Sequence, residues 1–291
     1  MTWLLSLLLF LCLLAAAAVG LSAHGSRRWA NATQTLTRRL EAARVDGRAG
    51  LQLPTRYDSR ELEGLPAPVQ RYFRAALREG QPIVTAATIA LAGRFNMSPT
   101  GEQWKPFTSR QRVVTRRPGF LWNAKVAMLP GVSVRVVDSY IAGQGLLRAA
   151  VLGLFTVADV QGGGEIARGE FMRYFAEAAW YPTALLPSQG VRWEAVDDSS
   201  ANATLTDGAL ALTLRFSFDA AGLIVAARAE ARGATVGKRV IMMPWEGRWS
   251  DYQVRDGMTL PMSGEAAWLP REGRKVYFVG TVTALSCEFS Q

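Results

Sequence analysis

The stretch Gly169-Glu-Phe-Met-Arg-Tyr-Phe-Ala-Glu-Ala-Ala-Trp-Tyr-Pro-Thr-Ala-Leu-Leu-Pro187 interrupts a chain whose apolar pattern is otherwise typical of strands. Its apolar residues from Phe171 to Ala178 recur at steps of three and four, the spacing that places side chains on one face of an α-helix. Pro182 lacks a backbone N–H, so we expect the helix to end near Trp180. Because this helix is so aromatic, it must bury most of its surface against neighbouring strands.

Strands are predicted on both sides of this helix by alternation of apolar and polar residues. Before it, we expect strands at 83–95, 109–116, 120–129, 132–141 and 146–157, and the chain closes with a strand at 277–289. About ten strands with short connections predict a mostly antiparallel sheet, and a sheet of that size curls. The expected fold class is therefore α+β, with a large, curled, half-barrel-like sheet packed around one central helix.

The chain begins with an almost unbroken apolar run at residues 3–23. Such a run is long enough to cross a hydrocarbon core of roughly 30 Å. No Lys or Arg precedes it and Arg27 and Arg28 follow it, which favours an uncleaved transmembrane helix over a cleaved signal peptide. The positive-inside rule then predicts a single-pass membrane protein with its body facing the cytoplasm, and the periplasmic face is the alternative.

Two shorter helices are expected next. Residues 29–45 form an amphipathic helix that lies either on the membrane surface or on the body, and residues 66–79 form the second helix. Residues 47–54 are predicted to be a linker. The expected organisation is a transmembrane anchor at 1–25, a basic juxtamembrane helix and linker at 26–60, and a single helix-plus-sheet domain at 61–291.

The net charge of +9 is unevenly distributed. Residues 1–120 hold 17 basic and 7 acidic side chains, whereas residues 121–291 hold 16 and 17. Anionic lipid headgroups explain basic charge beside an apolar run more simply than nucleic acid does. We therefore expect a membrane partner at residues 3–23, anionic lipids at Arg27, Arg28, Arg38 and Arg39, and no nucleic acid.

Several chemistries are excluded by the residues that the sequence lacks. His24 is the only histidine, which excludes a Ser-His-Asp triad and a His-ligated metal site from the body. Cys12 and Cys287 form no Cys-x-x-Cys motif and predict no disulfide framework. Neither a nucleophile elbow nor a P-loop is present. No cofactor, metal site or catalytic residue is predicted.

The remaining polar candidates are carboxylates and an arginine on predicted elements of the sheet and helix. Arg173 and Glu177 are four residues apart and can pair along the helix. As functional groups, the carboxylates would serve in acid–base chemistry or bind a hard cation. As structural groups, they would neutralise buried arginines. The predicted polar network consists of Asp138, Arg173, Glu177 and Glu246.

Four stretches resemble a bacterial family of membrane-associated proteins of unknown function. They are Leu65-Pro-Ala-Pro-Val-Gln-Arg-Tyr72, Pro118-Gly-Phe-Leu-Trp122, Phe171–Pro187 with the following Trp193-Glu-Ala-Val-Asp197, and Pro244-Trp-Glu-Gly-Arg-Trp-Ser-Asp-Tyr252. The resemblance covers roughly residues 60–290 and implies a single domain, but no activity or site residues. The expected curled sheet around a helix also resembles the half-open barrels that carry lipoproteins in the bacterial envelope, at the level of the fold alone.

Three functions remain open. The first is binding of a lipid-like or other hydrophobic ligand in a cleft between sheet and helix. The second is a structural or scaffolding role in a membrane complex, with the aromatics filling the core. The third is a carboxylate-based enzyme, with or without a divalent cation. The residues predicted to line a ligand cleft are Trp122, Tyr140, Tyr174, Trp180 and Trp245.

Overall fold

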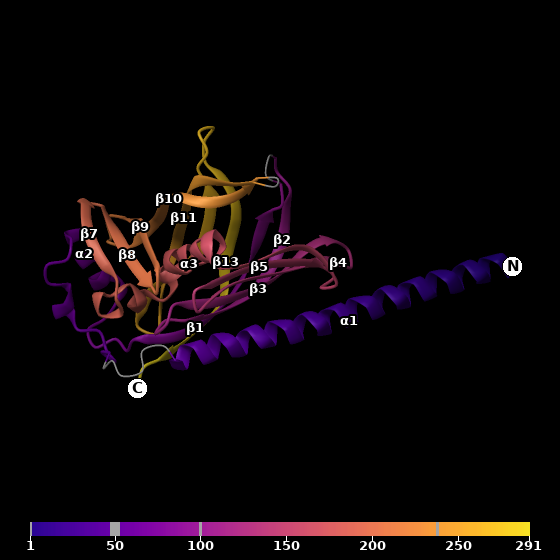
Figure 1. Cartoon of the computed structure of the whole chain (residues 1–291), viewed down its shortest axis with the longest axis horizontal. Coiled ribbons are helices and arrows are strands. Elements are labelled where there is room, and N and C mark those ends of the chain that lie inside the picture. Colours follow the sequence, from indigo (N-terminus) through magenta and orange to yellow (C-terminus); the bar gives the residue numbers. More distant parts are fainter. Residues whose placement is uncertain (1, 47–52, 99–100, 237–238) are drawn as a thin grey trace.

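A single antiparallel sheet of thirteen strands forms the body of the protein (Figure 1). The computed structural model describes residues 2–46, 53–98, 101–236 and 239–291. The first half of the sheet consists of β1 (Val84–Asn96), β2 (Trp104–Val114), β3 (Gly119–Leu129), β4 (Val132–Ile141), β5 (Gln144–Val151) and β6 (Phe155–Gly162). The second half consists of β7 (Arg192–Asp197), β8 (Ser200–Asp207), β9 (Leu210–Phe218), β10 (Ile224–Val236), β11 (Arg239–Arg255), β12 (Met258–Trp268) and β13 (Lys275–Phe289).

The strand order explains why the sheet needs a helical connection. Neighbouring strands of each half follow one another in the chain, and the halves join where β1 pairs with β13. Strands β6 and β7 therefore form the two edges. They are linked by α3 (Gly164–Ala176) and three short 3₁₀ helices, η2 (Glu177–Trp180), η3 (Pro182–Leu185) and η4 (Pro187–Gln189), which run through the inside of the curl (Figure 1). The predicted curled sheet with a central helix is confirmed.

The remaining helices cover the outside and one end of the sheet. They are α1 (Thr2–Asp46), the 3₁₀ helix η1 (Ser59–Leu62) and α2 (Ala67–Ala76). Alternate residues of β3 face the two helical layers: Phe120 and Trp122 belong to the core around α3, whereas Leu121 packs with Trp29 and Leu40 of α1. Residues 29–45 thus lie on the body, which was one of the two alternatives for this segment.

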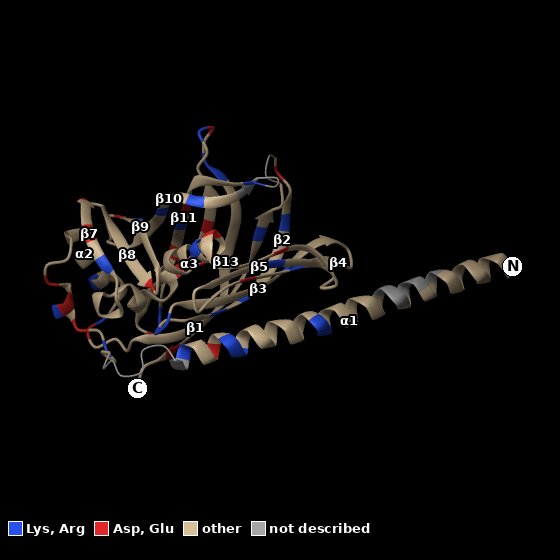
Figure 2. Cartoon of the chain, viewed as in Figure 1, with Lys and Arg blue, Asp and Glu red and all other residues tan. Residues whose placement is uncertain are grey.

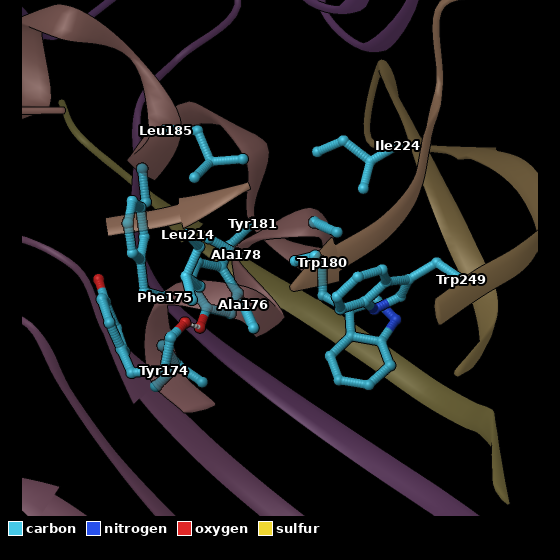
Figure 3. Packing of buried hydrophobic residues seen from close by; sticks show 14 of the residues in the cluster. Tyr174, Phe175, Ala176, Ala178, Trp180, Tyr181, Leu185, Leu214, Ile224 and Trp249 are labelled. Atoms are coloured by element: carbon cyan, nitrogen blue, oxygen red, sulfur yellow. Dashed lines mark hydrogen bonds between the residues drawn. The ribbon is translucent and has the colours of Figure 1, made fainter. Parts of the chain in front are cut away.

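Glycines in the central strands allow the inner helices to approach the sheet closely. Gly280 of β13 lies opposite Gly93 of β1 on one side and Gly264 of β12 on the other. A Cβ atom on Gly264 would lie 3.1 Å from the ring of Trp180. The indole N–H of Trp180 also donates to the carbonyl oxygen of Pro261 at 2.9 Å. Figure 3 shows this ring beside Trp249 in the buried cluster.

Three features of the fold differ from the predictions. The sheet has thirteen strands rather than about ten. Residues 146–157 form a hairpin, β5 and β6, instead of one strand, because Gly153 takes a positive φ of 72° in a turn between them. The central helix begins at Gly164, and its last turn is the 3₁₀ helix η2. Residues 47–52 of the predicted linker lie outside the described residues.

The N-terminal segment also differs from the expected division into an anchor and a separate basic helix. One continuous helix, α1, covers both, and its first half projects beyond the sheet (Figure 1). Among the described residues, none of the helices combines the length and the apolar character needed to cross a bilayer. The transmembrane segment predicted at residues 1–25 is therefore not supported.

Candidate functional site

Polar side chains from three neighbouring strands meet one side of α3 inside the curl. Gln111, Trp122 and Asp138 lie directly opposite one another on β2, β3 and β4. Residues 170, 173 and 177 follow at steps of three and four, so they share one side of the helical segment. We call Gln111, Trp122, Asp138, Glu170, Arg173 and Glu177 the Arg173 cluster.

Arg173 is bonded to three members of this cluster. Its Nη1 lies 2.8 Å from Asp138 Oδ2 and its Nε lies 2.8 Å from Glu177 Oε1. Its Nη2 donates to Gln111 Oε1 at 3.2 Å, and Gln111 Nε2 donates to Glu177 Oε2 at 2.6 Å. This geometry fixes the guanidinium group between strand and helix. It also gives both the oxygen and the nitrogen of the Gln111 side-chain amide a hydrogen-bond partner.

The guanidinium group also lies over aromatic rings. Its central carbon is 5.0 Å from the ring centre of Phe120 and 4.7 Å from that of Trp122. Only 15% of the Arg173 side chain is exposed. At such distances the rings attract the cation electrostatically. The buried charge of Arg173 is therefore stabilised by aromatic rings of β3 as well as by carboxylates.

Glu170 is the least solvated carboxyl group of the cluster, with 4% of the residue exposed. Burial, followed by the charge of Asp138, raises the pKa of Glu170 to about 8, while Arg173 and Arg232 oppose the rise. Burial raises the pKa of Asp138 as well, but the ion pair with Arg173 opposes this. We therefore assign the proton at neutral pH to Glu170 and the negative charge to Asp138.

A second arginine approaches from the other half of the sheet. Arg232 of β10 lies with its guanidinium carbon 4.9 Å from the ring centre of Trp245 and 5.9 Å from that of Trp268. It makes no ion pair with any residue in the described part of the chain. Because it opposes the rise in the pKa of Glu170, it contributes positive potential to the cluster.

Four buried polar atoms on this inner face have no partner among the described residues. They are Ser109 Oγ, Trp122 Nε1, Asp138 Oδ1 and Glu170 Oε2. Most buried polar atoms in proteins are hydrogen-bonded, and an unpaired one costs roughly 1–3 kcal/mol. Several such atoms on one face indicate a place that a further hydrogen-bonding group would complete.

The five aromatic residues predicted to line a cleft are all buried in this structure. Trp122 and Tyr140 border the Arg173 cluster, and the Tyr140 ring stacks on Phe171 with ring centres 4.9 Å apart. Tyr174 continues this stack, at 6.3 Å from Phe171. Figure 3 shows Tyr174 and Trp180 well separated within the buried cluster, and Trp245 donates its N–H to the Tyr277 hydroxyl on the other half of the sheet. The five residues therefore do not form one continuous lining.

The structure brings together three of the four residues of the predicted polar network. Glu246 of β11 instead pairs with Arg248 at 2.6 Å and Arg274 at 2.8 Å. Its neighbour Trp245 takes the inward position of the strand and packs in the core. Since successive strand residues point to opposite faces, Glu246 faces away from the Arg173 cluster.

Sequence reasoning missed Gln111, Glu170, Ser109 and Arg232. One signal was present for Glu170, which lies three residues before Arg173 and so shares its side of the helix. Gln111 lies between Arg110 and Arg112 in its strand. Successive side chains of a strand point to opposite faces, so two outward arginines would indicate that Gln111 points inward. For metal binding, no group of three or more His, Cys, Asp or Glu side chains in the described ranges could hold an ion.

Comparison with known proteins gives a family but no function. No curated protein matches the chain. A LolA superfamily protein from Nitrosomonas europaea is similar in structure, with 11% identity, coverage of 76% of this chain and 93% of that one, and a TM-score of 0.39. A beta-barrel-like protein of domain of unknown function DUF1849 from Brucella abortus shows 9% identity, coverage of 71% and 99%, and a TM-score of 0.28. Residues 63–286 match the model of a family of unknown function, DUF6920, and the chain therefore belongs to that family, as its resemblance to an uncharacterised family predicted.

Proposed function

We propose that the inner face of the sheet binds an amphipathic, lipid-like molecule whose polar group is held by the Arg173 cluster. The observation that carries this proposal is the set of buried polar atoms without partners, which comes from β2, β3, β4 and α3. A fold retains such atoms at a cost in stability, and a ligand that pairs with them recovers that cost.

The protonation states define the polar group that fits. With Glu170 protonated, its carboxyl group can donate one hydrogen bond, Asp138 Oδ1 accepts one, and Trp122 Nε1 donates one. The charges of Asp138 and Glu177 are already matched by Arg173 and the nearby Arg232. An uncharged group that both donates and accepts, such as a hydroxyl or an amide, therefore suits the site better than a phosphate.

The apolar part of the ligand would lie among the rings that surround the cluster. Phe120, Tyr140 and Phe171 are fully buried beside it. Because these rings pack closely between α3 and the sheet, entry requires α3 to separate from β3, β4 and β5. The connection from β6 to β7 consists of helical segments that pair with no strand, so its separation from the sheet would leave the strand order intact.

Native mass spectrometry of the purified full chain, with lipid analysis of the same sample, tests this proposal. We expect a stoichiometric lipid-like molecule in the wild type. Trp122→Phe keeps an aromatic ring, although a smaller one, but removes the unpaired N–H, and should lower the occupancy. Trp193→Phe is the matched control, because its N–H donates to Leu185 O at 3.0 Å, outside the cluster. A wild-type protein that is free of any such molecule after gentle extraction would contradict the proposal and favour the scaffolding role.

We also propose that the projecting half of α1 attaches the protein to a membrane. Exposed apolar side chains cover this half, namely Trp3, Leu4, Leu5, Leu7, Leu8, Leu9, Phe10, Leu13, Val19 and Leu21. Successive helical residues are rotated by about 100°, so residues 3–10 point to all sides of the helix. A groove on a partner protein covers one face of a helix, whereas this helix presents apolar side chains to a membrane surface whichever side of it makes the contact. The side of the membrane on which the body lies stays a prediction, with the cytoplasmic face favoured by the arginines that follow.

A further inference from the structure

The sheet ends in two turns at the place where α1 leaves it. These turns join β3 to β4 and β5 to β6, and the backbone N–H of Leu152 in the second donates to Ser133 O beside the first at 2.8 Å. A Cβ atom on Gly25 would lie only 2.1 Å from Leu152 O, so α1 touches the second turn at Gly25. We call residues 129–132 and 152–157 the sheet tip.

The sheet tip carries large apolar side chains that no other part of the described chain covers. Leu129 is 68% exposed, Phe155 61% and Val157 62%. On α1, the exposed apolar residues begin at Leu21, just beyond the contact at Gly25, and continue toward the N-terminus. Exposed apolar side chains of the body therefore lie next to the point where the projecting half of α1 begins.

A pair of basic residues lies directly behind this apolar surface. Lys125 of β3 and Arg135 of β4 are opposite each other in the sheet, although like charges in that position repel. Arg135 Nη2 donates to Ser26 Oγ of α1 at 3.2 Å, next to the exposed Arg27 and Arg28. Neither Lys125 nor Arg135 has an ion pair in the described part of the chain. Asp159 of β6 is already paired with Arg148 at 3.1 Å.

We propose that the sheet tip docks on the surface of a membrane that contains anionic lipids. Headgroup phosphates would neutralise Lys125 and Arg135, while Leu129, Phe155 and Val157 enter the boundary between headgroups and acyl chains. This inference rests on the proposed attachment through α1. Charge order supports lipid as the occupant: along α1 and along β3, exposed apolar residues lie toward one end and basic residues follow them. Figure 2 shows the basic residues of α1 and of the sheet in blue.

Hydrogen exchange of the full chain on vesicles tests the docking separately from the attachment. The vesicles contain phosphatidylcholine alone or with one part in four of phosphatidylglycerol, and flotation measures attachment. We expect backbone amides in residues 127–133 and 152–158 to exchange more slowly on the anionic vesicles. Lys125→Glu with Arg135→Glu should lose this protection but still float. The matched control is Arg215→Glu with Arg228→Glu, another directly opposed basic pair, on β9 and β10.

Exchange in residues 119–124 of β3 reports whether each variant is folded. Phe155→Ser with Val157→Ser supplies a second test that leaves the charges intact, and it too should lose protection. A protein that floats without any protection of the two segments would overturn the docking and leave the attachment standing. Equal protection on vesicles without anionic lipid, or full protection of the Lys125/Arg135 variant, would also overturn it. A protein that does not float would refute the attachment itself.

Discussion

Arg173 of α3 and Asp138 of β4 form an ion pair with Nη1 and Oδ2 2.8 Å apart, in a place where both side chains are mostly buried. The pair connects the central helix to the first half of the sheet. Desolvation of both charges opposes the pairing, so their attraction offsets that cost only while the remaining hydrogen bonds are made. The contact of α3 with the sheet therefore depends on the complete cluster.

Glu177→Ala should destabilise the protein strongly. It removes one of the two carboxylates that neutralise Arg173 and leaves Gln111 Nε2 without its acceptor. Breaking a buried pair in this way costs about 3–5 kcal/mol. Urea unfolding of the purified protein measures the change. Glu230→Ala is the control, because Glu230 is exposed and its pair with Arg228 should contribute at most about 1 kcal/mol. Similar losses in the two variants would show that the cluster is solvated.

Glu170 should make stability fall as the pH rises. The pKa of Glu170 is raised from 4.5 to about 8 in the folded protein, so the native state holds the extra proton between these values. The free energy of unfolding contributed by this group is then complete below pH 4.5 and is lost as the pH rises through about 8. Glu170→Gln should flatten this fall, which unfolding curves at pH 6 and pH 9 would reveal. An unchanged slope would mean that Glu170 ionises normally.

Gly145→Ala should separate α3 from β5. A Cβ atom at Gly145 would lie 2.6 Å from the backbone nitrogen of Ala167 in α3, and backbone cannot rotate away as a side chain can. Overpacking of this kind costs about 1–3 kcal/mol. Gly163→Ala, just before α3, is the control, because nothing lies within 4 Å of its added methyl group and its φ is −82°. Thermal unfolding should show a lower midpoint for the first variant only.

Tyr140→Phe should loosen the contact between the two halves of the sheet. The Tyr140 hydroxyl on β4 donates to Asp207 Oδ2 at the end of β8, at 2.7 Å. A hydrogen bond to a charged group is worth about 1.5–3 kcal/mol, and the change keeps the stacking ring on Phe171. Urea unfolding measures the loss. A variant as stable as the wild type would show that the bond is exchanged for one with water.

The sequence predicted those features that depend on local periodicity. Alternation revealed the strands because one face of each is buried, and the three- and four-residue steps around Phe171 revealed the helix. The hairpin at residues 152–154 escaped because its turn is apolar apart from Gly153. Glu170 escaped because a glutamate on a helix gives no local sign of whether solvent reaches it. The position of Glu246 relative to Arg173 could not be predicted, because only the pairing of distant strands decides which face of β11 meets α3.

The pairing of β1 with β13 has a consequence for synthesis of the chain. Strands β1 to β6 leave the ribosome as a complete meander, yet one side of β1 stays unpaired until residues 275–289 have been made, after β2 to β12. Until then the nascent protein presents an open strand edge in its centre, and such edges pair readily with other chains. Loss of the C-terminal strand would leave the two halves of the sheet without their shared border. Residues 275–289 therefore decide whether the protein closes on itself or associates with its neighbours.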